Sequence, residues 1–490
     1  MSALKRTLAT SLALASLVYG APNLEERTLD PICVQIASAI SSASDVYYAL
    51  DPLYAKGVSH WASSSSQLPN CVVEPGTAAD VGIILGIVGS TRTPFAVKGG
   101  GHASNPGFSS TTGVHISMYR FSEINYDATS QTVEVGAGLI WDDVYAALEP
   151  FNVNVVGGRV TGVGVAGFTL GGGYSWKTNQ YGLTIDTVTA YELVKPNGNV
   201  VTVTESSDPD LFKGLKGGFN NFGIVTKFTL QTFPQTQVWG GLITITAPHI
   251  PDVAAATAAF QANVNDPKAG IITTYNFLLG EPGISQLLFY DGPTPPAGIF
   301  DDFLAIPYFT KDIETRSFSS LVQASPSNAT AGSRAIFNTV SILEYTPALL
   351  DVILNETIFW GTNLSLKTGT FISYDVEPFL PSIYTHNAQS TAYPPVRSQG
   401  LTPFNIYYAW TSSIFDSDFH DAAKASAAAV YNAALSEGQS GIVGAAIYPN
   451  YAIFDTPLSD MYGSNLPALQ ALKAAVDPTN VMGLAGGFKF

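Results

Sequence analysis

A run of three glycines followed by a histidine is the first place in this chain where residue types and spacing suggest chemistry. Gly99, Gly100 and Gly101 follow a β-like segment, and His102 comes directly after them. Glycines accept positive φ, so successive backbone N–H groups can turn toward one point and form a nest for an anion such as a pyrophosphate. Lys98 stands beside this nest and would add positive charge. A tight turn in a β-rich region is the alternative.

A second glycine cluster spans residues 157–173 and carries a Gly-x-Gly-x-x-Gly pattern at Gly162, Gly164 and Gly167. This pattern is typical of dinucleotide-binding loops that open a helix. The residues that follow read Phe-Thr-Leu-Gly-Gly-Gly, which show no helical period and predict that no helix forms there. Asp186 lies near the position where a Rossmann fold carries its acidic residue. We nevertheless expect a loop outside a Rossmann fold.

A third cluster comprises Gly217, Gly218 and Gly223. Three separate glycine loops favour a long ligand with a diphosphate, held mostly by backbone groups, and FAD is the natural candidate. The six histidines are scattered without His-x-His or His-x-x-x-His spacing, so we predict no metal site. The acidic pairs at 142–143 and 301–302 are expected at helix starts or in loops rather than as paired catalytic carboxylates.

The composition is that of a folded protein with a large core. The chain has 490 residues, of which 46% are hydrophobic and 12% charged, and its net charge is −16. This excludes a disordered chain. The negative charge and the absence of basic runs argue against nucleic acid and anionic membranes as partners. We expect a small-molecule substrate and a monomer.

The N-terminus has the pattern of a secretory signal peptide. Lys5 and Arg6 precede an apolar run over residues 8–18 that is too short to span a membrane, and cleavage is expected after residue 20. Secretion fits the two cysteines, Cys33 and Cys71, which we predict to form a disulfide, with two buried thiols as the alternative. It also fits three potential N-glycosylation triplets, which begin at Asn328, Asn355 and Asn363.

The spacing of apolar residues predicts the elements that position the glycine loops. The first region is expected to hold strands at 131–135, 186–194, 200–204 and 224–230 and a helix at 140–148. The second is expected to hold strands at 242–246, 371–376 and 404–410 and helices at 254–264 and 422–435, and the tail a helix at 468–476.

This pattern predicts an α+β protein in which a domain is inserted into another. The first domain is expected to cover residues 21–236, with its core at 67–236. Residues 237–444 are expected to form an inserted substrate-binding domain, an antiparallel sheet covered by helices, and residues 445–490 to return to the first domain.

Four ordered motifs resemble those of one family, the vanillyl-alcohol-oxidase or PCMH-type FAD-linked oxidases. Residues 99–102, 162–174 and 216–226 resemble its flavin-binding half, and the Tyr-Pro-Asn-Tyr motif at 448–451 resembles the berberine-bridge-enzyme-like branch. The resemblance extends from about residue 71 onward and implies a two-part FAD-binding domain. It implies cofactor contacts at Lys98, Gly99, Gly100, Gly101, His102, Ala103, Ser104, Val160, Gly162, Val163, Gly164, Gly167, Gly172, Tyr174, Gly223, Ile224, Val225, Tyr448 and Asn450.

The resemblance further implies a covalent bond between His102 and the 8α-methyl group of the flavin. A histidine that only positions the cofactor is the alternative. Doubly linked members carry a cysteine where this chain has Val160, so a single covalent bond is expected, and a carbohydrate substrate is disfavoured. In related enzymes a small side chain at the position aligned with Val163 leaves dioxygen a path to the flavin, whereas a bulkier one can block it. Valine therefore favours an oxidase.

Removal of a hydride from a C–OH or C–NH centre needs a base for the other proton. The resemblance implies that a carboxylate, glutamine or tyrosine on the strand equivalent to 404–410 projects over the flavin. Here that strand carries no acid, and side-chain alternation puts Asn405 and Tyr407 on one face. We predict Tyr451 as the base, with Tyr407 as the second candidate and Tyr174 in the same pocket. The expected function is a secreted FAD-dependent oxidase that forms hydrogen peroxide. A flavin dehydrogenase or cyclase, and a catalytically silent secreted glycoprotein of the same fold, are the alternatives.

Overall fold

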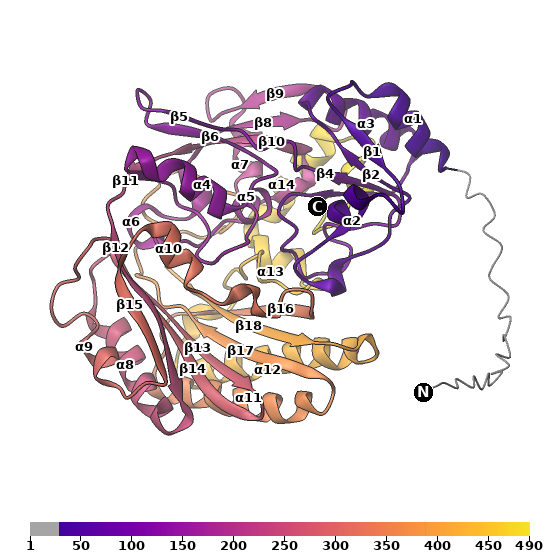
Figure 1. The fold of residues 1–490 in the computed structure, drawn as a ribbon. Coiled ribbons are helices and arrows are strands. Elements are labelled where there is room, and N and C mark those ends of the chain that lie inside the picture. The colour runs from indigo at the N-terminus through magenta and orange to yellow at the C-terminus, as the bar shows by residue number, and fades with distance from the viewer. Residues whose placement is uncertain (1–28, 388) are drawn as a thin grey trace, which may run out of the picture.

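The computed structural model describes residues 29–387 and 389–490 (Figure 1), so the predicted signal peptide lies outside the described residues. Its main sheets have the strand orders β1-β2-β4-β3, β5-β6-β10-β8-β9 and β15-β12-β14-β13-β17-β18-β16. The strands of the first two sheets are β1 Asp45–Tyr47, β2 Cys71–Glu74, β3 Phe95–Lys98, β4 Val114–Ser117, β5 Ile124–Asp127, β6 Thr132–Gly136, β8 Val188–Val194, β9 Val200–Val203 and β10 Ile224–Gln231.

In the four-stranded sheet, β4 pairs in parallel with β2 and β3, and helix α3 (Ala78–Thr91) connects β2 to β3. All strand pairs of the five-stranded sheet are antiparallel. Helix α4 (Trp141–Leu148) follows β6 and carries Asp142 and Asp143 in its first turn, where acidic side chains were expected. Strand β3 thus leads directly into the first glycine cluster, and β10 begins directly after Gly223 of the third.

Two local predictions in this region are wrong. Residues Val165–Leu170 form a short helix, α5, directly after Gly164, although the glycine-rich sequence predicted none. Val165 and Leu170 are buried against the core, and this tertiary packing outweighs the poor helix propensity. The run predicted as a strand from residue 186 begins with a 3-10 turn, and β8 starts only at Val188, because the Asp186 carboxylate accepts the Leu183 N–H and closes the turn.

The seven-stranded sheet is antiparallel throughout, as predicted for the second region. Its strands are β12 Val238–Thr246, β13 Ala269–Leu278, β14 Glu281–Tyr290, β15 Thr310–Arg316, β16 Arg334–Ile342, β17 Gly369–Val376 and β18 Thr402–Trp410. Figure 1 shows the helices α8 (Ile250–Asn263), α11 (Pro347–Ser365) and α12 (Asp416–Ser436) on the side of this sheet that faces away from the first part of the chain.

Side chains on β18 alternate between the two faces of the sheet, as the period of two requires. The Tyr408 hydroxyl forms a hydrogen bond with the Tyr374 hydroxyl, which in turn bonds to Ser426 of α12, on the helix side of the sheet. Tyr407 instead contacts Trp61 of the first part of the chain. The sheet therefore presents one face to its own helices and the other to the glycine-rich loops.

The C-terminal residues pack against the first part of the chain. After the helices α13 (Leu458–Tyr462) and α14 (Leu466–Val476), Ala485 forms a bridge with Phe95 of β3. The Phe488 carbonyl accepts a hydrogen bond of 3.0 Å from the Asn221 side chain. The C-terminus accordingly lies among the first sheets in Figure 1. In the part of the chain described here, no helix has the length and apolar character needed to span a membrane.

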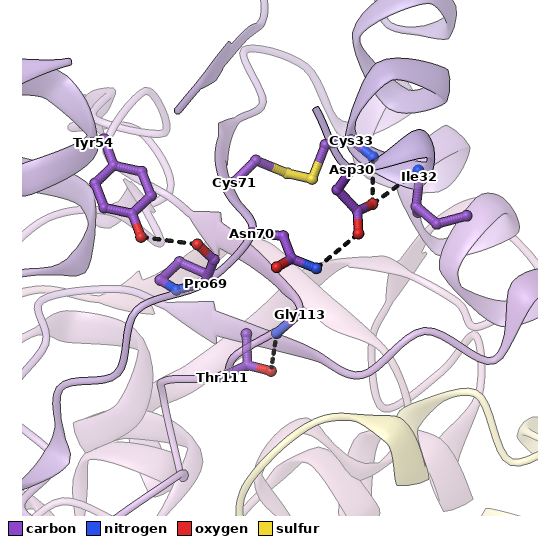
Figure 2. The surroundings of a disulfide bond; sticks show 9 residues. All are labelled: Asp30, Ile32, Cys33, Tyr54, Pro69, Asn70, Cys71, Thr111 and Gly113. Carbon is purple, nitrogen blue, oxygen red and sulfur yellow. Dashed lines mark hydrogen bonds between the residues drawn. A yellow bond between two sulfur atoms is a disulfide. The ribbon is translucent and has the colours of Figure 1, made fainter. Parts of the chain in front are cut away.

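Cys33 and Cys71 form a disulfide, which confirms the predicted pairing (Figure 2). It joins helix α1 (Pro31–Ala39) to the start of β2. Asp30 reinforces the junction because its carboxylate accepts the N–H of Cys33 and the side-chain amide of Asn70. The N-terminal helix is thus tied covalently to the four-stranded sheet.

Replacing Cys33 and Cys71 together with serine should lower the free energy of unfolding of the first region by about 3–4 kcal/mol, because the bond closes a loop in the unfolded chain. The bond spans 38 residues. Urea denaturation with and without reductant measures the effect. The wild type under reductant should approach the double variant, and equal midpoints for oxidised wild type and variant would contradict the prediction.

Candidate active site

The first two glycine clusters touch backbone to backbone. A Cβ on Gly100 would lie 2.4 Å from the Cα of Gly164, and a Cβ on Gly164 would lie 2.6 Å from the Gly100 nitrogen. The Asp142 carboxylate holds the second loop in place, since it accepts the Gly162 N–H at 2.9 Å and the Thr161 hydroxyl at 2.6 Å. Only glycine permits this approach, so the two loops form one continuous cradle of backbone groups.

The tail motif lies against the second cluster. The Asn450 side-chain amide donates to the Phe168 carbonyl at 3.0 Å and to the Tyr448 hydroxyl at 2.9 Å, and the Gly173 N–H donates to the same hydroxyl at 3.2 Å. A Cβ on Gly171 would lie 2.1 Å from the Asn450 oxygen. Residues from the end of the chain therefore complete a loop that belongs to its first half.

The third cluster connects to the first through Ala137. Gly223 has a φ of +142° and leads into β10. On this strand Thr226 accepts the Ala137 N–H at 2.9 Å, and the Ala137 carbonyl lies 2.9 Å from the position of a Cβ on Gly99. The three clusters that the sequence singled out thus adjoin one another in space.

His102 projects from the first glycine loop into an aromatic environment. The Trp61 ring stacks on the imidazole with 4.5 Å between ring centroids and 14° between planes. Burial lowers the pKa of His102 to about 4, so the ring is neutral at pH 7. Its Nε2 is buried and has no hydrogen-bond partner among the described residues. A glycine cradle beside a histidine nitrogen without a partner fits FAD bonded to His102.

Lys98 has partners within the protein. Its Nζ donates to the Ser59 carbonyl at 2.7 Å and to the Tyr119 hydroxyl at 2.8 Å, and burial lowers its pKa to about 8. The sequence suggested that this ammonium adds charge to the anion nest. The structure places it instead against the segment that follows helix α2 (Pro52–Val58).

The other predicted cofactor contacts take varied positions around the cradle. Val163 is partly buried, and its carbonyl accepts the Trp141 N–H at 3.0 Å. Ser104, Gly172, Ile224 and Val225 are buried, Ala103 and Val160 are partly exposed, and Gly167 is exposed.

Tyr451 lies in a buried network with two charged side chains. Its hydroxyl donates to Glu377 Oε1 at 3.1 Å and accepts from Arg159 at 2.9 Å, while Arg159 also donates to Glu377 Oε2 at 2.6 Å. Glu377 is 2% exposed and Arg159 8%. Burial raises the pKa of Glu377 to about 7, although the guanidinium of Arg159 opposes this rise.

A chain of aromatic contacts connects this network to His102. The Phe337 ring stacks on Tyr451 at 6.1 Å and on Trp61 at 5.9 Å, and Trp61 stacks on His102. Burial and the nearby Glu377 raise the pKa of Tyr451 well above its usual value, so a free phenolate is disfavoured there. The arrangement suits a proton relay in which the Tyr451 hydroxyl passes a proton to Glu377.

Sequence reasoning missed Arg159 and both carboxylates of this site. An acid was expected on β18, but Asp375 lies on the adjacent β17 and Glu377 directly after that strand. Asp375 is held by the Asn405 side chain, which donates to Oδ2 at 2.9 Å, and burial raises the Asp375 pKa. An Asp-x-Glu pair at the end of the predicted strand 371–376 was the available signal.

The two other predicted tyrosines lie in different surroundings. The Tyr407 hydroxyl donates to the Thr330 hydroxyl at 2.7 Å, and its ring packs on Phe337 at 4.9 Å. Tyr174 is buried, and its hydroxyl bonds to that of Tyr384, while its ring packs on Tyr448, which in turn packs on Tyr451. Of the three candidates, only Tyr451 contacts an ionisable acid through its hydroxyl.

Comparisons with known proteins agree with this geometry. Residues 69–204 match the family described as FAD binding domain. An FAD-dependent monooxygenase of Emericella nidulans, sdcF, is 30% identical over 455 residues, 89% of this chain and 94% of that protein. An uncharacterized FAD-linked oxidoreductase of Arthroderma benhamiae is 37% identical over 281 residues, 56% of each chain, and the matches to the first curated relatives span about half of their length.

The fold is also that of solved flavoenzymes. The structure of 6-hydroxy-D-nicotine oxidase from Arthrobacter nicotinovorans superposes with a TM-score of 0.75 at 19% identity, over 92% of this chain and 99% of that chain. This confirms the predicted fold class, an FAD-binding region of PCMH type combined with a second domain built on a sheet. The chain belongs to the FAD-linked oxidoreductases with an FAD-binding domain of the vanillyl-alcohol-oxidase or PCMH type, and its fold is that of the berberine-bridge-enzyme-like proteins.

Proposed function

We propose that this protein is an FAD-dependent oxidase that removes a hydride from a C–OH or C–NH centre of a small molecule, with the flavin bonded to His102 alone. The observation that carries the proposal is the Tyr451–Glu377–Arg159 network beside the aromatic contacts of His102. When bound, the flavin supplies the acceptor for the hydride and passes two electrons to dioxygen.

The residues of the chain manage the proton. The Tyr451 oxygen accepts the proton of the substrate hydroxyl or amine while its own proton passes to Glu377 Oε1, with which it already shares a hydrogen bond. Arg159 donates to the Tyr451 hydroxyl and to the Glu377 carboxylate and holds the two groups next to each other. Because the pKa of Glu377 is about 7, the carboxylate accepts a proton readily near neutral pH.

The test is a substrate screen under air that follows flavin absorbance, oxygen uptake and peroxide together. An oxidase consumes one dioxygen and forms one hydrogen peroxide for each substrate oxidised. Flavin reduced by substrate and not reoxidised by air indicates the dehydrogenase or cyclase alternative. A protein that is colourless after expression with adequate flavin contradicts the proposal and favours the silent glycoprotein. The buried carboxylates near Tyr451 argue against that alternative.

Monooxygenation is a second candidate, and the name of the Emericella nidulans relative favours it. The two reactions differ in the fate of the oxygen atoms. A monooxygenase places one atom of labelled dioxygen in the product, whereas an oxidase places both atoms in hydrogen peroxide. Mass spectrometry of the product formed under ¹⁸O₂ separates them.

Secretion is part of the proposal. The disulfide and the N-terminal pattern of charge and hydropathy support it. The asparagines of the three glycosylation triplets are exposed, as attachment of a glycan requires: Asn328, Asn355 and Asn363.

The role of Glu377 predicts the pH dependence of the reaction. Glu377 must be ionised to accept a proton, so the rate of flavin reduction should rise with pH up to a pKa near 7 and fall about tenfold per unit below it. The nearby Asp375 carboxylate also raises the pKa of Glu377. Asp375→Asn should therefore move this rise in rate to lower pH, and Glu377→Gln should abolish the rise. Stopped-flow measurement of the flavin reduction rate across pH tests this prediction. A pH-dependent rise that persists in Glu377→Gln would contradict the role of Glu377 as proton acceptor.

A further inference from the structure

Trp61 covers one face of the His102 imidazole. The two rings are nearly parallel, with 4.5 Å between centroids and 14° between planes. The Nε2 atom of His102 has no hydrogen-bond partner among the described residues, so no bond at that atom sets the orientation of the ring. The other constraint is a hydrogen bond between the imidazole and the backbone of His102 itself, so the stacked indole and this bond together fix how the ring is turned.

Trp61 is itself held from two sides. Its backbone N–H donates to the Gly101 carbonyl at 3.0 Å, within the loop that carries His102. Its carbonyl accepts the Gly332 N–H at 2.8 Å, and its indole N–H donates to the Ser327 carbonyl at 3.3 Å. The indole is therefore anchored both to the glycine loop and to the segment that precedes β16.

Lys98 strengthens this anchor. It directly precedes the glycine run, and its Nζ donates to the Ser59 carbonyl, two residues before Trp61. A longer contact of 3.4 Å reaches the Lys56 carbonyl in the last turn of α2. A buried ammonium is costly without such partners, so this contact fixes the segment of Trp61 relative to the loop of His102.

We propose that Trp61 is a positioning residue for covalent flavin attachment, holding the His102 ring in the orientation from which its nitrogen bonds to the 8α-carbon. This inference rests on the proposed function, in particular on the histidyl bond. Overall, the 8α-methyl group loses one hydrogen, the imidazole loses its N–H hydrogen, and an N–C bond forms. Dioxygen takes the two hydrogens with their two electrons and becomes hydrogen peroxide.

The state of the imidazole agrees with this role. Attack requires a neutral ring with a lone pair, and burial lowers the pKa of His102 to about 4. A single bond-forming contact is sensitive to ring orientation, and a small misplacement slows such a reaction strongly. An indole stacked on the ring restricts its rotation without forming a hydrogen bond to the Nε2 atom.

The test compares Trp61→Phe with Trp61→Met. Phenylalanine keeps a flat ring against His102, whereas methionine fills apolar volume without stacking. Each variant, like the wild type, is expressed under riboflavin limitation and purified as apoprotein in buffer without reductant. The fraction of flavin that stays with acid-precipitated protein is followed during incubation with FAD in air. Trp239→Leu, which removes an indole stacked on Phe300 in the seven-stranded sheet, is the matched control.

We expect Trp61→Phe to attach flavin within about threefold of the wild-type rate, and Trp61→Met to bind FAD but attach it at least about tenfold more slowly. The control should attach at the wild-type rate. Wild-type attachment in Trp61→Met, or equal slowing in both variants, overturns the inference. Loss of all flavin binding in Trp61→Met also overturns it, since the role is then structural. Wild-type protein without acid-stable flavin instead refutes the histidyl bond of the proposed function.

Discussion

Phenylalanine in place of Tyr451 is expected to slow substrate-dependent flavin reduction by about 10²–10⁴-fold, the usual contribution of a positioned acid–base group. The substitution keeps the ring that stacks on Phe337 but removes the hydroxyl that donates to Glu377. The substrate proton then has no direct path to the buried carboxylate. Flavin content should not change, because the ring packing remains. Anaerobic stopped-flow reduction measures the effect.

The matched comparison is Tyr407→Phe. Tyr407 was the second candidate for the base, and its hydroxyl donates to Thr330 rather than to an acid. Loss of that bond should change the rate by only a few-fold, on the scale of about 1 kcal/mol for one neutral hydrogen bond. A large loss in Tyr407→Phe together with a small one in Tyr451→Phe would reverse the assignment.

Alanine in place of His102 should release all flavin from the protein in acid. The sequence has two cysteines, and both are in the disulfide, so no cysteine offers a second attachment point. The glycine cradle does not depend on the imidazole, so FAD should still bind without a covalent bond. Precipitation in trichloroacetic acid separates the two states: the yellow colour should stay with wild-type protein and appear in the supernatant of His102→Ala.

His249→Ala is the control for this experiment. His249 forms a surface pair with Asp252 at the start of α8. Its replacement should leave acid-stable flavin at the wild-type level. Acid-stable flavin in His102→Ala would mean that another residue forms the bond, and freely released flavin in the wild type would leave His102 as a contact residue only.

Local sequence was sufficient for part of the secondary structure. The alternation of apolar residues predicted β6, β9, β10, β17 and β18, and helical spacing predicted α4, α8, α12 and α14. These patterns depend on residues a few positions apart, which the chain places on one face of an element. The prediction failed where tertiary packing outweighed propensity, at helix α5 after Gly164.

Lys98 shows the limit of reading a side chain from its neighbours in sequence. Beside a glycine nest, an ammonium suggests a contact to an anion. In the fold, the side chain reaches the Ser59 carbonyl, 39 residues away in sequence. Its direction depends on where helix α2 packs, and nothing in the residues around Lys98 encodes that position.

The sequence by itself determined the glycine clusters, the histidine that follows the first of them, the two cysteines and the tail motif with Tyr451. The tertiary structure decided what surrounds them. Arg159 and Glu377 are 218 residues apart, and Arg159 and Tyr451 are 292 apart, yet all three share hydrogen bonds. Trp61 reaches His102 only because strands and loops from both parts of the chain converge on it. Glycine patterns follow from local backbone freedom, whereas a proton relay depends on side chains that only the folding of distant segments brings together.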